Sequence, residues 1–290
     1  MCSNGPVGAD DPDLLRTIAT GVAVEAAELV MRMRGFGVHD VRTKSSDTDV
    51  VTSADTAAED LLRDRLGTLR PGDAVLGEEG GDDLGGDPGG GGADGGADGG
   101  GGRVCWVLDP IDGTVNYLYG IPWYAVSVAA TLDGVSLAGA VVEPASGRVW
   151  SAALGRGADL DGRPLRVSRV QRLDRALVGT GFSYRPELRE RQGRLAGALL
   201  PRARDIRRFG SAALDLCAVA AGQLDGYYEH AIQPWDWAAG ALIASEAGAR
   251  IRLPAAAVGH AAGTPMMLAA APGVFSELDR ALAELGATSF

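Results

Sequence analysis

Carboxylate side chains interrupt apolar stretches of this sequence at three widely separated places. Glu78 and Glu79 follow one short apolar run, Asp109 and Asp112 follow another, and Asp236 lies between two tryptophans. Ionised side chains rarely sit beside buried strands and helices unless another charge offsets theirs. Without a neighbouring Cys or His, such carboxylates suit Mg²⁺ or Mn²⁺ better than Zn²⁺. The pattern predicts a fold that gathers these three places around a hard cation.

The segment DPIDGT at positions 109–114 carries the most specific of the three patterns. Pro110 fixes its own φ and has no N–H to donate, so we expect the chain to turn here instead of continuing a strand. At such a turn the carboxylates of Asp109 and Asp112 can bind one ion or bridge two. The Ile111 carbonyl between them offers a further oxygen ligand.

Gly113 and Thr114 follow directly and are expected to begin a helix. The free N–H groups and the positive dipole end of a helix start favour a phosphate. The alternative is that Asp112 serves only as the N-cap of this helix, a position where Asp is common. The longer motif around it favours the metal interpretation. A cation site next to an anion site predicts phosphoryl chemistry.

Composition limits the other classes of function. The chain has 290 residues, of which 46% are hydrophobic, enough for a large core in one domain or two packed halves. Its formal net charge of −11 argues against nucleic acid or an anionic membrane as the main partner. The three cysteines lack CxxC spacing, the polar acidic start is unlike a signal peptide, and no apolar run could span a membrane. We therefore expect a cytoplasmic protein.

Hydrophobic periodicity predicts alternating helices and strands with antiparallel hairpins. This order indicates an α/β (α+β) layered sandwich. We divide it into a disordered tail at 1–12, an N-terminal half with the metal site at 13–150, and a C-terminal half at 151–290 that completes the substrate pocket. The expected helices cover 13–34, 53–69, 187–200, 211–221, 234–247 and 273–285; the expected strands cover 74–77, 104–108, 125–132, 135–142, 148–153, 176–180, 205–209, 225–230, 250–253 and 266–270.

Residues 80–102 form a low-complexity stretch directly after Glu79. It holds 14 glycines and five aspartates in 23 residues. Such a composition cannot bury enough apolar surface to offset the entropy lost on ordering. We expect a disordered surface loop.

Two stretches, WVLDPIDGTVNYLYGIP and WDWAAGALIASEAGA, resemble the signature regions of the inositol monophosphatase family. GEE and DVVTSAD match its other catalytic segments, and the resemblance covers about 13 to 285 apart from the glycine-rich loop. RDRLGTLRPGDAVLGEEGG and FGSAALDLCAVAAGQLDGYYEH are most similar to the SuhB-type enzymes of actinobacteria. The resemblance implies an αβαβα sandwich of the inositol monophosphatase and fructose-1,6-bisphosphatase type. It also implies a homodimeric phosphomonoesterase that hydrolyses myo-inositol 1-phosphate and related polyol phosphates and is inhibited by lithium.

The same resemblance implies a set of metal ligands. Glu78, Asp109 and the Ile111 carbonyl match the ligands of a first Mg²⁺, and Asp109, Asp112 and Asp236 match those of a second. Glu78 also matches a residue near a third, weaker ion. Two to three Mg²⁺ are therefore implied, with Mn²⁺ as a substitute.

Thr114 and Asp55 match the pair that orients and deprotonates the attacking water, with no phospho-enzyme intermediate. On local sequence alone, Asp55 could instead be the N-cap of the helix that follows it. Glu79 is counted with the catalytic residues as a partner of the ligands; its alternative is a solvated loop acid. Lys44, the only lysine, matches a flexible loop that approaches the third ion.

The resemblance also implies the substrate contacts. The backbone amides of Gly113 and Thr114 are expected to hold the phosphate. The alternatives are that Ser211 is only an N-cap and that Glu229 is a surface acid. The expected contacts to the substrate hydroxyls come from Asp112, Gly210, Ser211, Ala212 and Glu229, and Asp236 is a further expected substrate-binding residue.

Other phosphatases of the same superfamily remain alternatives. Histidinol-phosphate phosphatase, fructose-1,6-bisphosphatase and 3′-phosphoadenosine 5′-phosphate phosphatase could all share the metal motifs. Two features favour inositol phosphate as the substrate: the segment Gly210–Ala212, and Glu229. A regulatory binding protein, the role of some SuhB-type proteins, is the alternative from another class. An intact metal set on an acidic chain disfavours it.

Overall fold

The computed structural model describes residues 8–37, 41–43, 50–83, 103–254 and 266–287. Lys44 and most of the glycine-rich stretch, 84–102, lie outside them. Within the described residues, no helix has both the length and the apolar character needed to cross a membrane.

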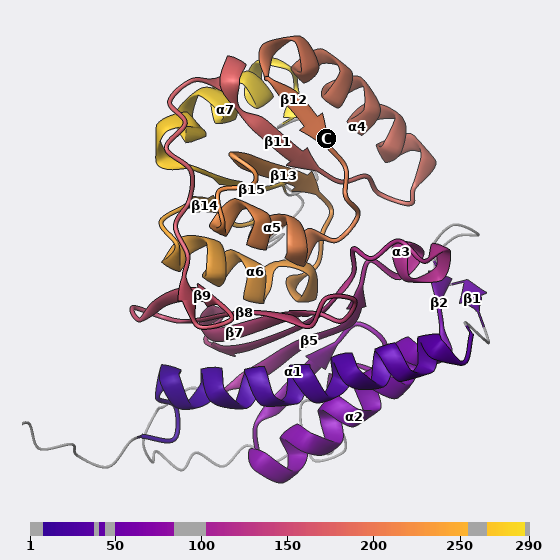
Figure 1. The fold of residues 1–290 in the computed structure, drawn as a ribbon. Helices are drawn as coiled ribbons and strands as arrows, with labels where there is room; N and C mark the ends of the chain where they lie inside the picture. Colours follow the sequence, from indigo (N-terminus) through magenta and orange to yellow (C-terminus); the bar gives the residue numbers. More distant parts are fainter. Residues whose placement is uncertain (1–7, 38–40, 44–49, 84–102, 255–265, 288–290) are drawn as a thin grey trace, which may run out of the picture.

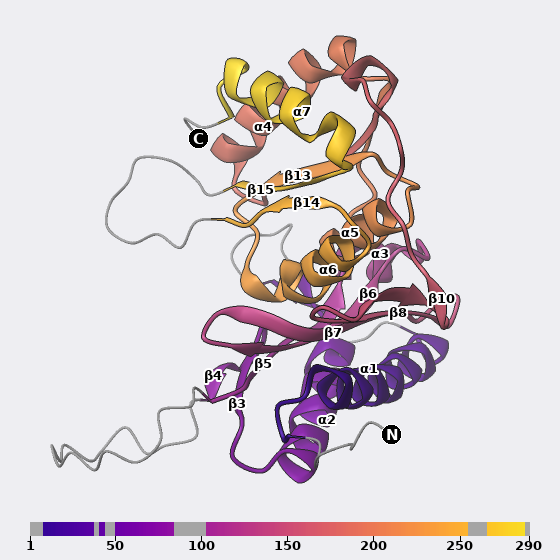
Figure 2. The same cartoon turned by 90° about the vertical axis from the view of Figure 1, so that its left-hand side faces the viewer.

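Helices and sheets alternate in five layers over the described part of the chain (Figure 1). Helices α1 (Pro12–Gly35) and α2 (Ser53–Leu69) form the first layer and cover one face of a large sheet. Helices α5 (Ala212–Ala220) and α6 (Pro234–Glu246) lie between the large sheet and a smaller one. Helices α4 (Pro186–Leu199) and α7 (Pro272–Glu284) cover the outer face of the smaller sheet (Figure 2). The predicted αβαβα sandwich is confirmed.

The large sheet has eight strands in the part of the chain that is described. Only the pairing of β3 with β5 is parallel within it. In spatial order it contains β10 (Arg163–Pro164), β9 (Gly157–Leu160), β8 (Arg148–Ala153), β7 (Val135–Glu143), β6 (Ala125–Leu132), β5 (Cys105–Asp112), β3 (Ala74–Gly77) and β4 (Gly81–Asp83). The predicted hairpin between β6 and β7 is confirmed, with positive φ at Asp133 (50°) and Gly134 (79°), as a type I′ turn requires.

The smaller sheet has five strands among the described residues. Strand β11 pairs in parallel with β12 and β13, whereas β15 pairs antiparallel with β13 and β14. In spatial order it contains β12 (Asp205–Arg207), β11 (Leu177–Thr180), β13 (Gly226–His230), β15 (Met266–Ala270) and β14 (Arg250–Arg252). Short elements complete the described chain: β1 (Arg42–Thr43), β2 (Val50–Val51), α3 (Thr114–Tyr119), η1 (Leu173–Arg175) and η2 (Leu200–Arg202).

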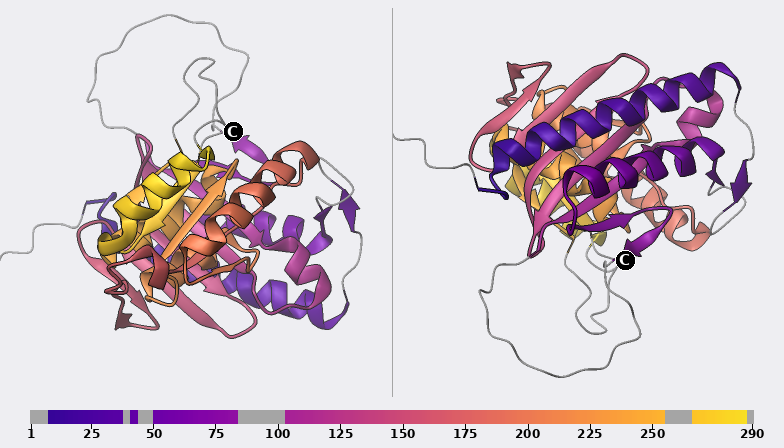
Figure 3. Two further views of the ribbon diagram at one scale, coloured as in Figure 1. Left: turned by 90° about the horizontal axis from the view of Figure 1, so that it is seen from above. Right: turned by 90° about the horizontal axis from the view of Figure 1, so that it is seen from below.

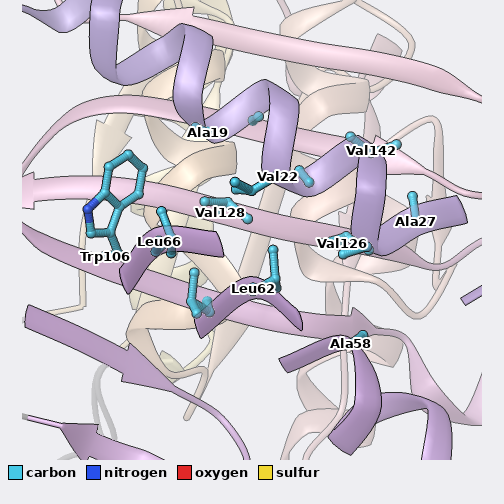
Figure 4. Packing of buried hydrophobic residues seen from close by; sticks show 14 of the residues in the cluster. Ala19, Val22, Ala27, Ala58, Leu62, Leu66, Trp106, Val126, Val128 and Val142 are labelled. Atoms are coloured by element: carbon cyan, nitrogen blue, oxygen red, sulfur yellow. The ribbon is translucent and has the colours of Figure 1, made fainter. Parts of the chain in front are cut away.

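Each interface between layers has its own apolar core. Figure 4 shows the first, where Val22 of α1 and Leu62 and Leu66 of α2 pack against Trp106 and Val128 of the large sheet. Seen from below, α1 and α2 lie side by side across that sheet (Figure 3). The smaller sheet has an apolar core on each of its two faces. Neighbouring residues of a strand point to opposite sides, so its central strands β11, β13 and β15 contribute side chains to both cores.

The centre of the sandwich depends on small side chains. A Cβ atom on Gly139 of β7 would lie 2.9 Å from the backbone Cα of Ala239 in α6. A Cβ on Gly240 would be 2.9 Å from the Leu216 side chain of α5. These contacts are tighter than ordinary van der Waals packing, so α6 comes this close to β7 and to α5 only because glycine stands at both positions.

The structure differs from the sequence expectations at several boundaries. The expected disordered tail at 1–12 reaches into α1, which begins at Pro12 with Asp11 as its N-cap, and the expected strand 205–209 ends at Arg207. Gly81–Asp83, which fall in the stretch expected to be disordered, pair with β3 as β4, and the rest of that stretch lies outside the described residues. The expected boundary at residue 150 falls within β8, and β9 and β10 extend the large sheet to Pro164. Strand β5 does not end at Leu108 but continues to Asp112. The predicted helices of 13 or more residues are confirmed to within one residue at each end.

We expect Gly139→Ala to lower the free energy of unfolding by about 1–3 kcal/mol, because the new methyl group meets helix backbone that cannot move aside. Gly21→Ala is the matched control, since a Cβ at Gly21 in α1 meets nothing within 4 Å. It should leave stability unchanged or raise it by up to about 1 kcal/mol. Urea unfolding of both variants checks this, and equal midpoints would contradict the packing account.

Candidate active site

A β-bulge at the end of β5 turns two carboxylates to one side of the sheet. Asp109 pairs with Ser127 of β6 and Asp112 pairs with Ala125, so β5 has one residue more than its partner over this interval. In a regular strand, residues three apart point to opposite faces, and one extra residue brings them to the same face. The Ile111 N–H donates to Asp109 Oδ1 at 3.1 Å and holds the bulge. The motif therefore works through a bulge and not through the turn that Pro110 suggested.

A third carboxylate comes from the first turn of α6. Asp236 is its third residue, and the Gln233 N–H donates to Asp236 Oδ2 at 2.5 Å in a capping box. One oxygen each from Asp109, Asp112 and Asp236 lie within 4.8 Å of one another. This is the only such group of three among the described residues. The sequence prediction that these three acids meet is confirmed.

The closeness of these acids is electrostatically costly without a cation. Burial raises the pKa of Asp112 to about 6 even though hydrogen bonds from Ser211 and Ala213 oppose the shift. Burial and the charges of Asp112 and Glu78 raise the pKa of Asp236 well above its usual value. An all-oxygen set whose charges repel one another fits a hard divalent cation, which would stabilise all of them in the ionised form.

Asp112 also joins the two halves of the molecule. Ser211 Oγ donates to Asp112 Oδ2 at 2.6 Å, and the Ala213 N–H donates to the same oxygen at 2.7 Å. Ser211 also caps α5, since its Oγ accepts from the Leu214 N–H at 3.2 Å. Asp112 is not the N-cap of α3, a position that Gly113 occupies. Asp112 instead lies at the N-terminus of α5, where backbone N–H groups favour a negative charge.

Thr114 and Asp55 meet as the resemblance implied. Thr114 Oγ1 lies 3.2 Å from Asp55 Oδ1 and 3.0 Å from the Ile111 carbonyl. The other carboxylate oxygen of Asp55 accepts from the N–H and the hydroxyl of Thr52 at 2.9 and 2.6 Å. The alternative of Asp55 as an N-cap is wrong, because Thr52 caps α2 and Asp55 is the third residue of its capping box. Asp55 is fully buried and links α2 to α3.

Only glycine fits at position 113, because of its backbone conformation and because of the atoms around it. Its φ is +96°, and an added Cβ would lie 3.1 Å from the carbonyl oxygens of Gly210 and Trp123. Asn116 of α3 fixes this contact, because its Nδ2 donates to the Trp123 and Phe209 carbonyls at 2.7 and 2.8 Å. No role was predicted for Asn116, although it belongs to the DPIDGTVN stretch.

Glu229 and Asp215 place two further carboxyl groups at the cavity. Glu229 Oε2 accepts from Tyr227 Oη at 2.5 Å, and burial raises the pKa of Glu229 to about 7. Asp215 Oδ1 accepts from Trp123 Nε1 at 3.3 Å. Burial and the nearby Glu229 charge raise the pKa of Asp215 well above normal, and Arg208 partly offsets both shifts. Glu229 is not a surface acid, and neither Asp215 nor Arg208 was predicted from the sequence.

These groups line a single cavity of about 490 Å³. Glu79 is not among the described residues that line it; its N–H donates to the Glu59 carboxylate. Asp55 lies behind Thr114. The predicted residues that do line the cavity are Glu78, Asp109, Ile111, Asp112, Gly113, Thr114, Gly210, Ser211, Ala212, Glu229 and Asp236.

A cavity with a carboxylate group that could hold a cation, a helix start and a hydroxyl–carboxylate pair is the arrangement expected of a metal-dependent phosphatase. The chain belongs to the inositol monophosphatase family, whose sequence profile matches residues 11–288. This is a family of metal-dependent phosphatases acting on small phosphate esters.

The comparisons with individual proteins agree with this placement. The chain is 54% identical to an inositol-1-monophosphatase of Mycobacterium leprae, over 94% of each chain. It is 39% identical to a protein of Pseudomonas aeruginosa named Nus factor SuhB, over 80% of this chain and 82% of that protein. The solved structure of Mycobacterium tuberculosis SuhB superimposes with a TM-score of 0.78 at 46% identity, covering 96% of this chain and 99% of that one.

We expect Asn116→Ala to lower the free energy of unfolding by about 1–3 kcal/mol, because two partly buried carbonyl groups lose their donor. Activity should fall as well, since Gly113 and Gly210 are no longer held together. Ser146→Ala, which removes an exposed hydrogen bond to the Arg148 N–H, is the control and should change neither property. Denaturant unfolding and phosphate release measured on the same preparations check both expectations, and a stable, fully active Asn116→Ala would refute the role.

Proposed function

We propose that this protein is a Mg²⁺-dependent phosphomonoesterase that hydrolyses myo-inositol 1-phosphate and related polyol phosphates. One observation carries the proposal: a single cavity joins the three-carboxylate group, the start of α3 with the Thr114–Asp55 pair, and the carboxyl groups of Glu229 and Asp215. The first two parts suit a phosphate ester, and the third suits the hydroxyl groups of a polyol.

We assign two to three Mg²⁺ to the carboxylates, with Mn²⁺ as a substitute. Glu78, Asp109 and the Ile111 carbonyl are the proposed ligands of one ion, and Asp109, Asp112 and Asp236 those of another. When bound, such cations neutralise the carboxylates, lower the pKa of water and stabilise negative charge on the leaving oxygen. The donors are all oxygens, in agreement with this choice.

Thr114 and Asp55 are proposed to move the proton of the attacking water. The Thr114 hydroxyl lies between two acceptors, Asp55 Oδ1 and the Ile111 carbonyl, so its own proton is held and its lone pairs face away from them. A water that donates to Thr114 can pass a proton through the hydroxyl to Asp55. The N–H groups at the start of α3, from Gly113 and Thr114, are proposed to hold the phosphate. Glu79 is kept in the proposal as a partner of the ligands, placed outside the cavity lining.

The part of the cavity lined by Glu229 and Asp215 is proposed to select the alcohol part of the phosphate ester. Glu229 and Asp215 can each accept from, or when protonated donate to, a substrate hydroxyl. Gly210, Ser211 and Ala212 line the cavity beside them. A rigid wall that pairs acids with vicinal hydroxyls favours a cyclic polyol over an alcohol without neighbouring hydroxyls. The homodimer implied by the resemblance and the cytoplasmic location expected from the composition remain predictions.

Phosphate release from several esters tests the substrate. We expect turnover in the order myo-inositol 1-phosphate above histidinol phosphate and fructose 1,6-bisphosphate, loss of turnover in EDTA, recovery with Mg²⁺, and inhibition by Li⁺. Preference for another ester would keep the metal mechanism and replace the substrate. Turnover that survives EDTA would contradict the proposal.

Relatives named Nus factor SuhB, at 34–39% identity, support a regulatory binding role as the second candidate. The same assay separates the two functions. If purified protein hydrolyses none of the esters with Mg²⁺, and binds RNA or transcription factors instead, the regulatory role replaces the enzyme.

A pair of Thr114 variants tests the proton transfer. Thr114→Ser keeps a hydroxyl near Asp55 and should retain most of kcat. Thr114→Val has nearly the same shape but no hydroxyl, and should lower kcat by about 10²–10⁴-fold. Steady-state kinetics at saturating Mg²⁺, with Mg²⁺ affinity measured in parallel, checks this. Equal kcat values for the two variants would remove Thr114 from the mechanism.

A further inference from the structure

Glu59 is a buried acid of α2 outside the cavity lining. It stands four residues after Asp55, one turn further along the helix, and is only 2% exposed. The structure places it against the turn that follows β3. A carboxylate buried so deeply needs partners for both of its oxygens.

The turn from Gly77 to Gly80 wraps around this carboxylate. The Glu79 N–H donates to Glu59 Oε2 and the Gly80 N–H to Glu59 Oε1, both at 2.8 Å. Arg63 adds charge compensation, because its Nε and Nη2 both lie 2.9 Å from Oε1. Together these bonds use both oxygens of the carboxylate.

The turn also needs its glycines for this contact. A Cβ on Gly80 would lie 2.7 Å from both Glu59 Oε1 and Arg63 Nη2, and a Cβ on Gly77 would collide with the Glu59 carboxylate. Neither glycine has a positive φ, so the backbone conformation does not require glycine here. The close approach of the turn to Glu59 and Arg63 does. The GEEG sequence therefore fits around Glu59 as a complementary surface.

Glu78 is carried into the cavity by the same turn. Its own N–H donates to the Leu108 carbonyl at 3.2 Å, one residue before Asp109. The turn is thus fixed on one side by β5 and on the other by Glu59. Within the described residues, the turn is followed by the short β4, which pairs with β3.

We propose that Glu59 is a positioning residue that holds Glu78 in place for cation binding. This inference rests on the proposed function, because it takes Glu78 as a metal ligand. Helix α2 then supports the site at two points. Asp55 holds Thr114, and Glu59 holds the turn that carries Glu78. Residues that orient metal ligands typically contribute about 10–100-fold in metal affinity.

The test is Glu59→Gln, which has the same shape but replaces one accepting oxygen with an amino group. That group cannot accept the N–H of Glu79 or Gly80, so the turn should loosen. Metal-stripped protein is titrated with Mg²⁺ by calorimetry, and the Mg²⁺ concentration for half-maximal phosphate release is measured separately. We expect about 10–100-fold weaker Mg²⁺ binding, with kcat at saturating Mg²⁺ within a few-fold of wild type.

Glu246→Gln is the matched control. Glu246 also accepts two backbone N–H groups of a turn, from Gly155 and Gly157 at 2.8 and 2.7 Å, but that turn joins β8 to β9 away from the cavity lining. It should lose stability without any change in Mg²⁺ affinity. Equal shifts in Mg²⁺ affinity for the two variants would show a general structural effect and overturn the inference.

Gly80→Ala provides a second variant if Glu59→Gln fails to fold. It pushes the turn away from Glu59 without changing α2, and should weaken Mg²⁺ binding in the same direction. Wild-type affinity in either folded variant would overturn the positioning role alone. Wild-type protein that binds no Mg²⁺ and releases no phosphate would instead overturn the proposed function, so the two failures are distinguishable.

Discussion

The fold has to accommodate the electrostatic repulsion between carboxylates that lie close together in its interior. Oxygens of Asp109, Asp112 and Asp236 lie within 4.8 Å of one another, with pKa values of Asp112 and Asp236 raised by burial and by neighbouring acids. Such a group costs stability unless hydrogen bonds, helix N-termini and cations offset its charge. The fold supplies the first two, through Ser211, Ala213 and the first turns of α5 and α6. The third is left to a bound metal.

The layered architecture explains how these groups reach one place. The bulge of β5 comes from the large sheet, and α5 and α6 come from the layer above it (Figure 1). Ala239 and Gly139 at the centre let α6 lie directly on β7. On the other side of the sheet, α2 holds Thr114 and the Glu78 turn through Asp55 and Glu59. The site is thus supported from both faces of the sheet.

Local pattern predicted most of the elements and the metal group, because amphipathic periodicity and the DPIDGT motif are properties of contiguous residues. The sequence could not show what depends on distant contacts. Asn116, Asp215 and Glu59 look like ordinary polar residues until their partners, Phe209, Trp123 and the Gly77–Gly80 turn, are brought beside them. The bulge was missed for a related reason: Pro110 suggests a chain turn, and only pairing with β6 shows a continued strand with one extra residue. The roles of the individual catalytic residues remain predictions.

Calorimetric unfolding of metal-stripped protein tests the central claim most directly, with wild type and Asp236→Asn compared in EDTA and in Mg²⁺. Asn keeps the oxygen that accepts the Gln233 N–H but removes one of the repelling charges. The account predicts that Mg²⁺ raises the Tm of wild type by mass action, and that the variant has the higher Tm in EDTA but responds less to Mg²⁺. A wild-type Tm that Mg²⁺ leaves unchanged, together with a variant less stable than wild type in EDTA, would contradict it.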